Sequence, residues 1–261
     1  MSSDIEFTKQ NLDEYLKALA KEYRRLSGTK IRAELILIGG ASVLINYNFR
    51  PMTSDVDGTI QASSAMKDAI NRVGDKYGLP FGWLNEDFVY TKSYTRKLSQ
   101  FSTYYRTFSN IVEVRTISAE YLVAMKLCAG RQFKHDFSDV VGILAEHKKR
   151  GIPISMDRLK QAYIDLYEDW NNMPGNSQTF INYVFEHDNC EELYNMISHD
   201  ESIIGALLEE FETENPGVVK EGNLMDVVSN LTAQADSASI LQILGKKQEE
   251  QINITEEADD R

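Results

Sequence analysis

A short apolar run near the start of the chain ends at two adjacent glycines. Ala33–Ile38 is rich in leucine and isoleucine, which predicts a buried strand, and residues 41–47 have helical character after Gly39 and Gly40. A glycine turn between a strand and a helix lets backbone N–H groups and the positive helix end approach a phosphate, and Ser42 adds a hydroxyl. Many such turns use glycines for steric reasons alone, so the turn by itself leaves both interpretations open.

Two aspartates follow the glycines at a distance of about 15 residues. Residues 53–60 alternate enough to predict a second strand, in which Asp55 and Asp57 share one face because side chains two positions apart point the same way. Two such carboxylates repel each other unless a cation lies between them. Mg²⁺ prefers oxygen ligands and commonly also binds substrate phosphates, with Mn²⁺ as the alternative ion. An Asp-x-Asp pair on a solvent-facing strand edge is the competing interpretation.

The remaining periodicity predicts an α/β fold of the α+β type, followed by helices only. We expect a small mixed β-sheet flanked by helices in residues 1–150, an acidic helical domain in residues 151–245 and a disordered tail in residues 246–261. A turn at Ser109 and Asn110 is expected to join two strands. Those strands are 103–108 and 111–117, and the expected helices are 6–27, 63–77, 118–131, 136–149, 155–170, 177–187, 190–212 and 222–245.

The net charge of −12 is divided unevenly along the chain. Residues 1–150 contain 22 Lys and Arg against 17 Asp and Glu, a net charge of +5, whereas residues 151–261 contain 6 against 23, a net charge of −17. The mean charge argues against nucleic-acid binding, but the charge of the first half does not. The acidic half is expected either to fold against the basic half and restrict access of an acceptor, or to offer a docking surface for a partner.

Hydropathy and cysteine usage indicate the cellular setting. No apolar run approaches the ~20 residues of a membrane helix, and the first residues lack the basic and apolar segments of a signal peptide. Neither Cys128 nor Cys190 lies in a metal-ligand spacing, which favours reduced structural thiols. We therefore expect a cytoplasmic protein without a membrane partner.

A second group of charged residues lies about 70 residues after the aspartate pair. Lys126 belongs to a predicted helix that is otherwise apolar, where a buried cation is costly without a partner. Asp136 and Asp139 are three residues apart and share one face of the next predicted helix. A Lys–Asp pair that only joins the two helices is the competing interpretation, and Arg131 and Lys134 are compatible with plain surface charges.

The first segment resembles the polymerase-beta-like nucleotidyltransferase superfamily, and looks most like its small bacterial branch related to the AbiEii-type abortive-infection toxins. That branch shows Gly-Gly or Gly-Ser, a short helix, and then Arg-x-x-[Ser/Thr]-x-Asp-[Val/Ile]-Asp. Arg50, Thr53, Asp55 and Asp57 stand at these positions here. The resemblance covers about residues 33–145.

A second match to that branch lies downstream. Residues 120–131 are similar to its helix with Met-Lys, Ala and Arg, and residues 135–140 are similar to its Asp-x-x-Asp helix. By this resemblance Lys126 contacts nucleotide phosphate, and one of Asp136 or Asp139 is a further functional acid.

The resemblance implies a Mg²⁺-dependent enzyme that moves a nucleotidyl group from an NTP, such as ATP, to an acceptor. It also implies tRNA or a protein as acceptor, a toxin–antitoxin or phage-defence role, and an antitoxin-like protein partner. A third metal ligand is expected from a neighbouring strand, where Glu113 is the candidate, although Glu113 equally fits an exposed strand residue paired with Arg115. The implied catalytic residues are Asp55, Asp57, Lys126 and Asp136, and the implied nucleotide-binding residues are Gly39, Gly40, Ser42, Arg50, Thr53 and Lys126.

The alternative function is a binding or regulatory protein that keeps this fold without the activity. Gly58 favours it, because relatives usually carry an apolar residue after Asp-x-Asp and a glycine is expected to loosen the strand end. The acidic second half favours it as well, because acidic surfaces repel phosphate polymers.

Overall fold

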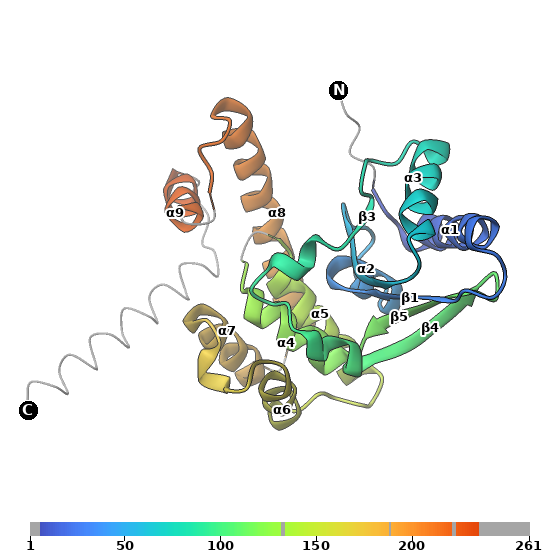
Figure 1. Ribbon diagram of the computed structural model, residues 1–261. Helices are drawn as coiled ribbons and strands as arrows, with labels where there is room; N and C mark the ends of the chain where they lie inside the picture. Colours follow the sequence, from blue (N-terminus) through green and yellow to red (C-terminus); the bar gives the residue numbers. More distant parts are fainter. Residues whose placement is uncertain (1–5, 132–133, 188, 221–222, 235–261) are drawn as a thin grey trace, which may run out of the picture.

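The computed structural model describes residues 6–131, 134–187, 189–220 and 223–234. They form a five-stranded mixed sheet with helices on its faces, followed by helices only, which confirms the α/β fold expected from the sequence (Figure 1). The strands are β1 (Ala33–Leu37), β2 (Val56–Gln61), β3 (Leu84–Asn85), β4 (Ser102–Phe108) and β5 (Val112–Ile117). The α-helices are α1 (Lys9–Ser27), α2 (Gly39–Asn46), α3 (Ala65–Tyr77), α4 (Ala119–Ala129), α5 (Asp136–Lys149), α6 (Met156–Tyr167), α7 (Gly175–Glu186), α8 (Cys190–Glu214) and α9 (Leu224–Gln234). Three 3₁₀ helices are η1 (Asp87–Tyr90), η2 (Arg96–Phe101) and η3 (Trp170–Asn172).

The sheet has the strand order β3-β2-β1-β5-β4, with β1 at its centre. β1 pairs in parallel with β5 and antiparallel with β2, β2 pairs in parallel with β3, and β4 pairs antiparallel with β5. The predicted turn at Ser109 and Asn110 is confirmed, and both residues have positive φ, the geometry that matches the twist of a hairpin. In the pairing of β1 with β2, Leu37 lies opposite Gly58, so the aspartate pair lies where β1 ends and α2 begins.

The two faces of the sheet belong to two hydrophobic cores. Leu35 and Leu37 point toward α1 and α3, which cover one face (Figure 1). Ile36 and Ile117 point the other way, into a core with α4 and α5. Asp57 shares this second face with Ile36, because Ile36 pairs with the residue two positions beyond Asp57 and strand side chains alternate. Alternation along β2 therefore places Asp57 on the side of the sheet where α4 and α5 pack.

The first helix shows how the local sequence fixes its element. The Thr8 side chain and the Asn11 side chain cap each other's backbone N–H groups at the start of α1. Phe7, which the sequence places inside the helix, instead forms an isolated antiparallel bridge with Thr53. The buried stripe of the helix is Leu12, Leu16, Leu19, Ala20 and Tyr23, at the spacing of three and four that the sequence shows.

The C-terminal helices share a core with the helices that follow the sheet. Phe137 of α5 stacks on Phe180 of α7 with ring centroids 4.0 Å apart, and Leu159 of α6 and Ile197 of α8 are buried in the same core. Side chains from both sides of residue 150 therefore pack together, while the division of the chain at that point stays a prediction. The predicted tail, residues 246–261, lies outside the described residues.

The second strand differs from its prediction at both its start and its glycine. It begins at Val56 rather than Thr53, so Asp55 lies just before the strand. Gly58 does not loosen the strand: a Cβ built there would lie 2.9 Å from the carbonyl oxygen of Ile36, and β2 continues to Gln61. A glycine at this position therefore allows β2 to approach β1 closely.

Candidate active site

The two aspartates of the motif lie beside the first turn of α2. Asp55 is exposed, and Asp57, the second residue of β2, is partly buried. The backbone N–H of Ile38 donates to the carbonyl oxygen of Asp57 at 2.9 Å, which holds β2 against the residue that precedes α2. The Thr53 hydroxyl donates to Asp55 Oδ1 at 3.1 Å. The structure therefore brings both carboxylates to the place where β1 passes into α2.

The titration of Asp57 reflects this arrangement. Burial, together with the negative charge of Asp55, raises the pKa of Asp57 to about 6, while Arg131 and Lys134 act in the opposite direction. A partly buried carboxylate next to a second carboxylate is unfavourable when ionised. A divalent cation between the two would relieve that cost, so the electrostatics fit a metal site.

The glycine turn leaves the start of α2 open. Gly39 has a φ of +57°, a left-handed conformation that favours glycine, and no atom beyond its chain neighbours and its own helix lies within 4 Å of the position of a Cβ there. Ile38, the residue before the helix, provides no side-chain cap. The first N–H groups of α2 have no intrahelical partner, and together with the helix dipole they suit an anionic ligand.

Gly40 has a different role from Gly39. A Cβ on Gly40 would collide with the Thr53 hydroxyl and would lie 3.1 Å from the guanidinium of Arg50. The absent side chain lets the segment with Arg50 and Thr53 pack against α2, and Thr53 in turn holds Asp55. Gly40, Arg50, Thr53 and Asp55 thus form one packed unit, which gives a physical reason for their occurrence together.

Ser42 is not at the surface of the site. The residue is fully buried, and its hydroxyl accepts a hydrogen bond of 3.3 Å from the backbone N–H of Ile117. This bond joins α2 to the end of β5. The structure therefore does not bring Ser42 to a position that a nucleotide contacts.

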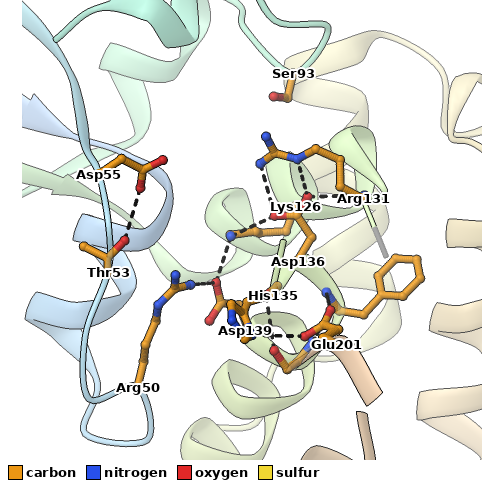
Figure 2. Close-up of polar contacts among 12 residues, drawn as sticks. Arg50, Thr53, Asp55, Ser93, Lys126, Arg131, His135, Asp136, Asp139 and Glu201 are labelled. Atoms are coloured by element: carbon orange, nitrogen blue, oxygen red, sulfur yellow. Dashed lines mark hydrogen bonds and ion pairs between the residues drawn. The ribbon is translucent and has the colours of Figure 1, made fainter. Parts of the chain in front are cut away.

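Lys126 lies in a buried ion network between α4 and α5. Its Nζ is 2.8 Å from Asp136 Oδ1 and 2.8 Å from Asp139 Oδ2, and Arg50 Nη1 is 2.5 Å from Asp139 Oδ2 (Figure 2). Burial acts to lower the pKa of Lys126, but the charges of Asp136 and Asp139 outweigh it, so the pKa is raised. These contacts match the interpretation in which the Lys–Asp pair joins two helices, and they do not expose Lys126 to a phosphate.

Arg131 belongs to this network and also lies near the aspartate pair. Its Nε donates to Asp136 Oδ2 at 2.9 Å, and its side chain remains 42% exposed. Figure 2 shows the Arg131 guanidinium and the Asp55 carboxylate projecting from two separate segments, and the charge of Asp55 acts to raise the pKa of Arg131. Sequence reasoning left Arg131 and Lys134 as surface charges, yet both act on the pKa of Asp57. The Arg in the downstream family pattern was the signal that pointed to Arg131.

Asp87 is a third acid near the pair that sequence reasoning did not find. In the pairing of β2 with β3, Asp57 lies opposite Asn85, and η1 begins two residues later at Asp87. The negative charge of Asp87 contributes to the raised pKa of Asp57. The strand that positions Asp87 has only two residues, too few for a periodic signal.

Glu113 is placed away from the aspartates. It lies opposite Glu34 in the pairing of β1 with β5, near the start of β1, whereas Asp57 lies at its end. The Glu113 carboxylate pairs with Arg115 at 2.7 Å, as the competing interpretation expects. Within the part of the chain that the structure describes, no group of three or more His, Cys, Asp or Glu residues is arranged to hold a metal ion.

Glu201 of α8 fixes the start of the helix that carries Asp136 and Asp139. Its Oε1 accepts hydrogen bonds from the backbone N–H groups of Phe137 at 3.0 Å and Ser138 at 3.4 Å. Burial raises the pKa of Glu201, and its contact with His135 acts in the opposite direction. A residue of the helical C-terminal part therefore stabilises the start of α5, the helix that carries Asp136 and Asp139.

Comparison with known proteins identifies the family of the chain. Residues 14–190 match the family described as a nucleotidyltransferase of unknown function, DUF6036. No curated protein and no solved structure gives a significant match. The match does not single out the branch related to AbiEii-type toxins, and no helix among the described residues is long and apolar enough to cross a membrane. The matched residues include β1, α2, the aspartate pair and the α4–α5 segment, and the chain belongs to this nucleotidyltransferase family.

Proposed function

We propose that this protein transfers a nucleotidyl group from an NTP to an acceptor hydroxyl in the space between Asp55 and Arg131. The observation that carries the proposal is the meeting of three features at one place: two adjacent carboxylates, the open start of α2 at Gly39, and an arginine on the facing wall. The first feature suits a metal ion and the other two suit phosphate.

The roles follow from position and charge. The start of α2 at Gly39 binds the phosphates, and Arg131 with Lys134 stabilises their negative charge from the other side. The acceptor hydroxyl attacks the α-phosphorus, the bond to the bridging oxygen of the β-phosphate breaks, and pyrophosphate leaves. Asp57 is positioned to accept the hydroxyl proton or to share a cation with Asp55.

Mg²⁺ fits the residues that are present. Two carboxylates and substrate phosphates are a common set of protein ligands for this ion, which retains water in its other positions. Asp55 and Asp57 would hold it, with Mn²⁺ as the alternative, and it would neutralise charge on the phosphates. Lys126, Asp136, Asp139 and Arg50 act through the buried network that positions Arg131 rather than through contact with the nucleotide.

A thermal-shift measurement tests NTP binding and its metal dependence. With Mg²⁺ and an NTP at about 100 times its Kd, the chain should gain about 2.7 kcal/mol of stability, because a ligand that binds only the folded state stabilises it. Asp57→Asn should lose the Mg²⁺-dependent part. Glu113→Gln is the matched control, a carboxylate-to-amide change on the same sheet face. An unchanged Mg²⁺-dependent shift in Asp57→Asn would refute the metal assignment.

The second candidate is an NTP-binding regulatory protein without transfer activity. Among the described residues, Asp87 acts on the pKa of Asp57 but does not form with Asp55 and Asp57 a group arranged to hold a metal ion, which favours this candidate. A thermal shift with NTP combined with no label transfer to any component of a lysate would establish this candidate instead. A tRNA or protein acceptor, an antitoxin-like partner and a defence role rest on the family resemblance alone and stay proposals.

A further inference from the structure

A groove of about 550 Å³ lies between α1 and α3, the helices that cover the sheet face opposite Asp57. Lys17, Lys21 and Arg25 follow one another at four-residue spacing along α1, and Arg72 and Lys76 do the same along α3. Residues four apart lie on one helix face, so each wall of the groove carries a row of cations. The row on α1 extends for about 12 Å.

The positive charge of this groove is only partly compensated. Glu22 is the carboxylate that pairs with Arg25 at 2.6 Å and with Arg72 at 3.2 Å. Within the described residues, Lys17 and Lys21 form no ion pair. Lys76 lies over the ring of Tyr77, with its Nζ 4.9 Å from the centroid. The groove therefore combines cations that are free to bind an anion with an aromatic ring on its lining.

We propose that this groove binds the backbone of a single-stranded RNA. Rows of cations that follow a phosphodiester chain, with an aromatic ring for a base, are the usual means of binding single strands. Glu14 also lines the groove, and a carboxylate only accepts hydrogen bonds. Ribose offers a 2′-hydroxyl donor for it, whereas the DNA backbone offers none, so the lining favours RNA.

Fluorescence anisotropy with the full chain and a short unstructured RNA tests the proposal. The logarithm of the binding constant should fall with the logarithm of salt concentration with a slope of about −0.7 for each phosphate contacted. The triple variant Lys17→Glu, Lys21→Glu, Lys76→Glu should bind at least about tenfold more weakly at low salt, with a slope less steep by about 2. A second triple variant with Gln at the same positions should lose the same slope without charge reversal.

The matched control is Lys97→Glu, Lys149→Glu, Lys160→Glu, which changes the net charge equally on residues outside the groove. It should retain the slope and most of the affinity. Equal losses in the two Glu triple variants, or equal binding of RNA and of single-stranded DNA of the same sequence, would overturn the proposal. RNA binding in the groove does not require the proposed transfer reaction. The NTP-dependent thermal shift should be unchanged in all three triple variants. A loss of RNA binding at the groove can therefore be distinguished from a loss of NTP binding at the active site.

Discussion

Replacing Asp57 by asparagine is expected to stabilise the fold while it abolishes transfer. The pKa of Asp57 is about 6 in the folded chain against an ordinary value of 3.8. One pKa unit corresponds to about 1.4 kcal/mol. The ionised carboxylate therefore lowers the free energy of unfolding at pH 7 by up to about 3 kcal/mol, and by about 1–2 kcal/mol once screening by solvent at this partly exposed group is included.

The sign of this effect depends on pH in a defined way. Below pH 3.8 Asp57 is protonated in both the folded and the unfolded chain, so the native protein and Asp57→Asn should have similar stability. Between pH 3.8 and about 6 the folded state binds the proton more tightly, so the native protein loses stability as the pH rises and the variant does not. Urea unfolding without Mg²⁺ or NTP, across this range, measures the difference. A variant that is less stable than the native protein at pH 7, or a difference independent of pH, would show that ionised Asp57 does not destabilise the folded chain.

Further predictions concern Lys126, Gly40 and Arg131. Lys126→Met should destabilise the fold by about 3–5 kcal/mol in urea unfolding, because the buried carboxylates of Asp136 and Asp139 each lose one of their two cationic partners; a loss below about 1 kcal/mol would show that the network is not buried in solution. Gly40→Ala should cost about 1–3 kcal/mol and lower the transfer rate by displacing Thr53 and Asp55, whereas an unchanged rate would contradict that coupling. Arg131→Ala should weaken NTP binding and move the acidic limb of the pH–rate profile to higher pH, because Arg131 lowers the pKa of Asp57. Arg131→Lys should move the acidic limb part of the way back to its native pH. An acidic limb that keeps its native pH in both variants would contradict the proposed role of Arg131 beside the aspartates.

The sequence was sufficient to predict the local parts of the site. The strand–glycine–helix turn at Gly39 and the proximity of Asp55 and Asp57 follow from residues close together in the chain, and the structure contains both. Helix and strand positions were also largely correct because apolar spacing reports burial directly. The start of β2 was misjudged because Thr53 pairs with Phe7, a contact that no local pattern reveals.

The parts that the sequence did not predict depend on packing between distant segments. Ser42 lies at a plausible phosphate turn, but the rotation of α2 buries its hydroxyl against Ile117. Lys126 was recognised as a costly buried cation, yet its enclosure follows from the position of α5 relative to α4. Arg131 and Asp87 approach the aspartates from other elements, so their roles appear only once the fold is assembled.

A labelling experiment with NTPs tests whether Asp55 and Asp57 support transfer of a nucleotidyl group. The protein is incubated with Mg²⁺, RNA or lysate, and each NTP labelled at either the α- or the γ-phosphate. We expect the α-label to become attached to an acceptor and the γ-label to leave as pyrophosphate, with no attachment in Asp55→Asn or Asp57→Asn and normal attachment in Glu113→Gln. Attachment of the γ-label instead, or attachment of the α-label that persists in Asp57→Asn, would show that these aspartates do not support nucleotidyl transfer.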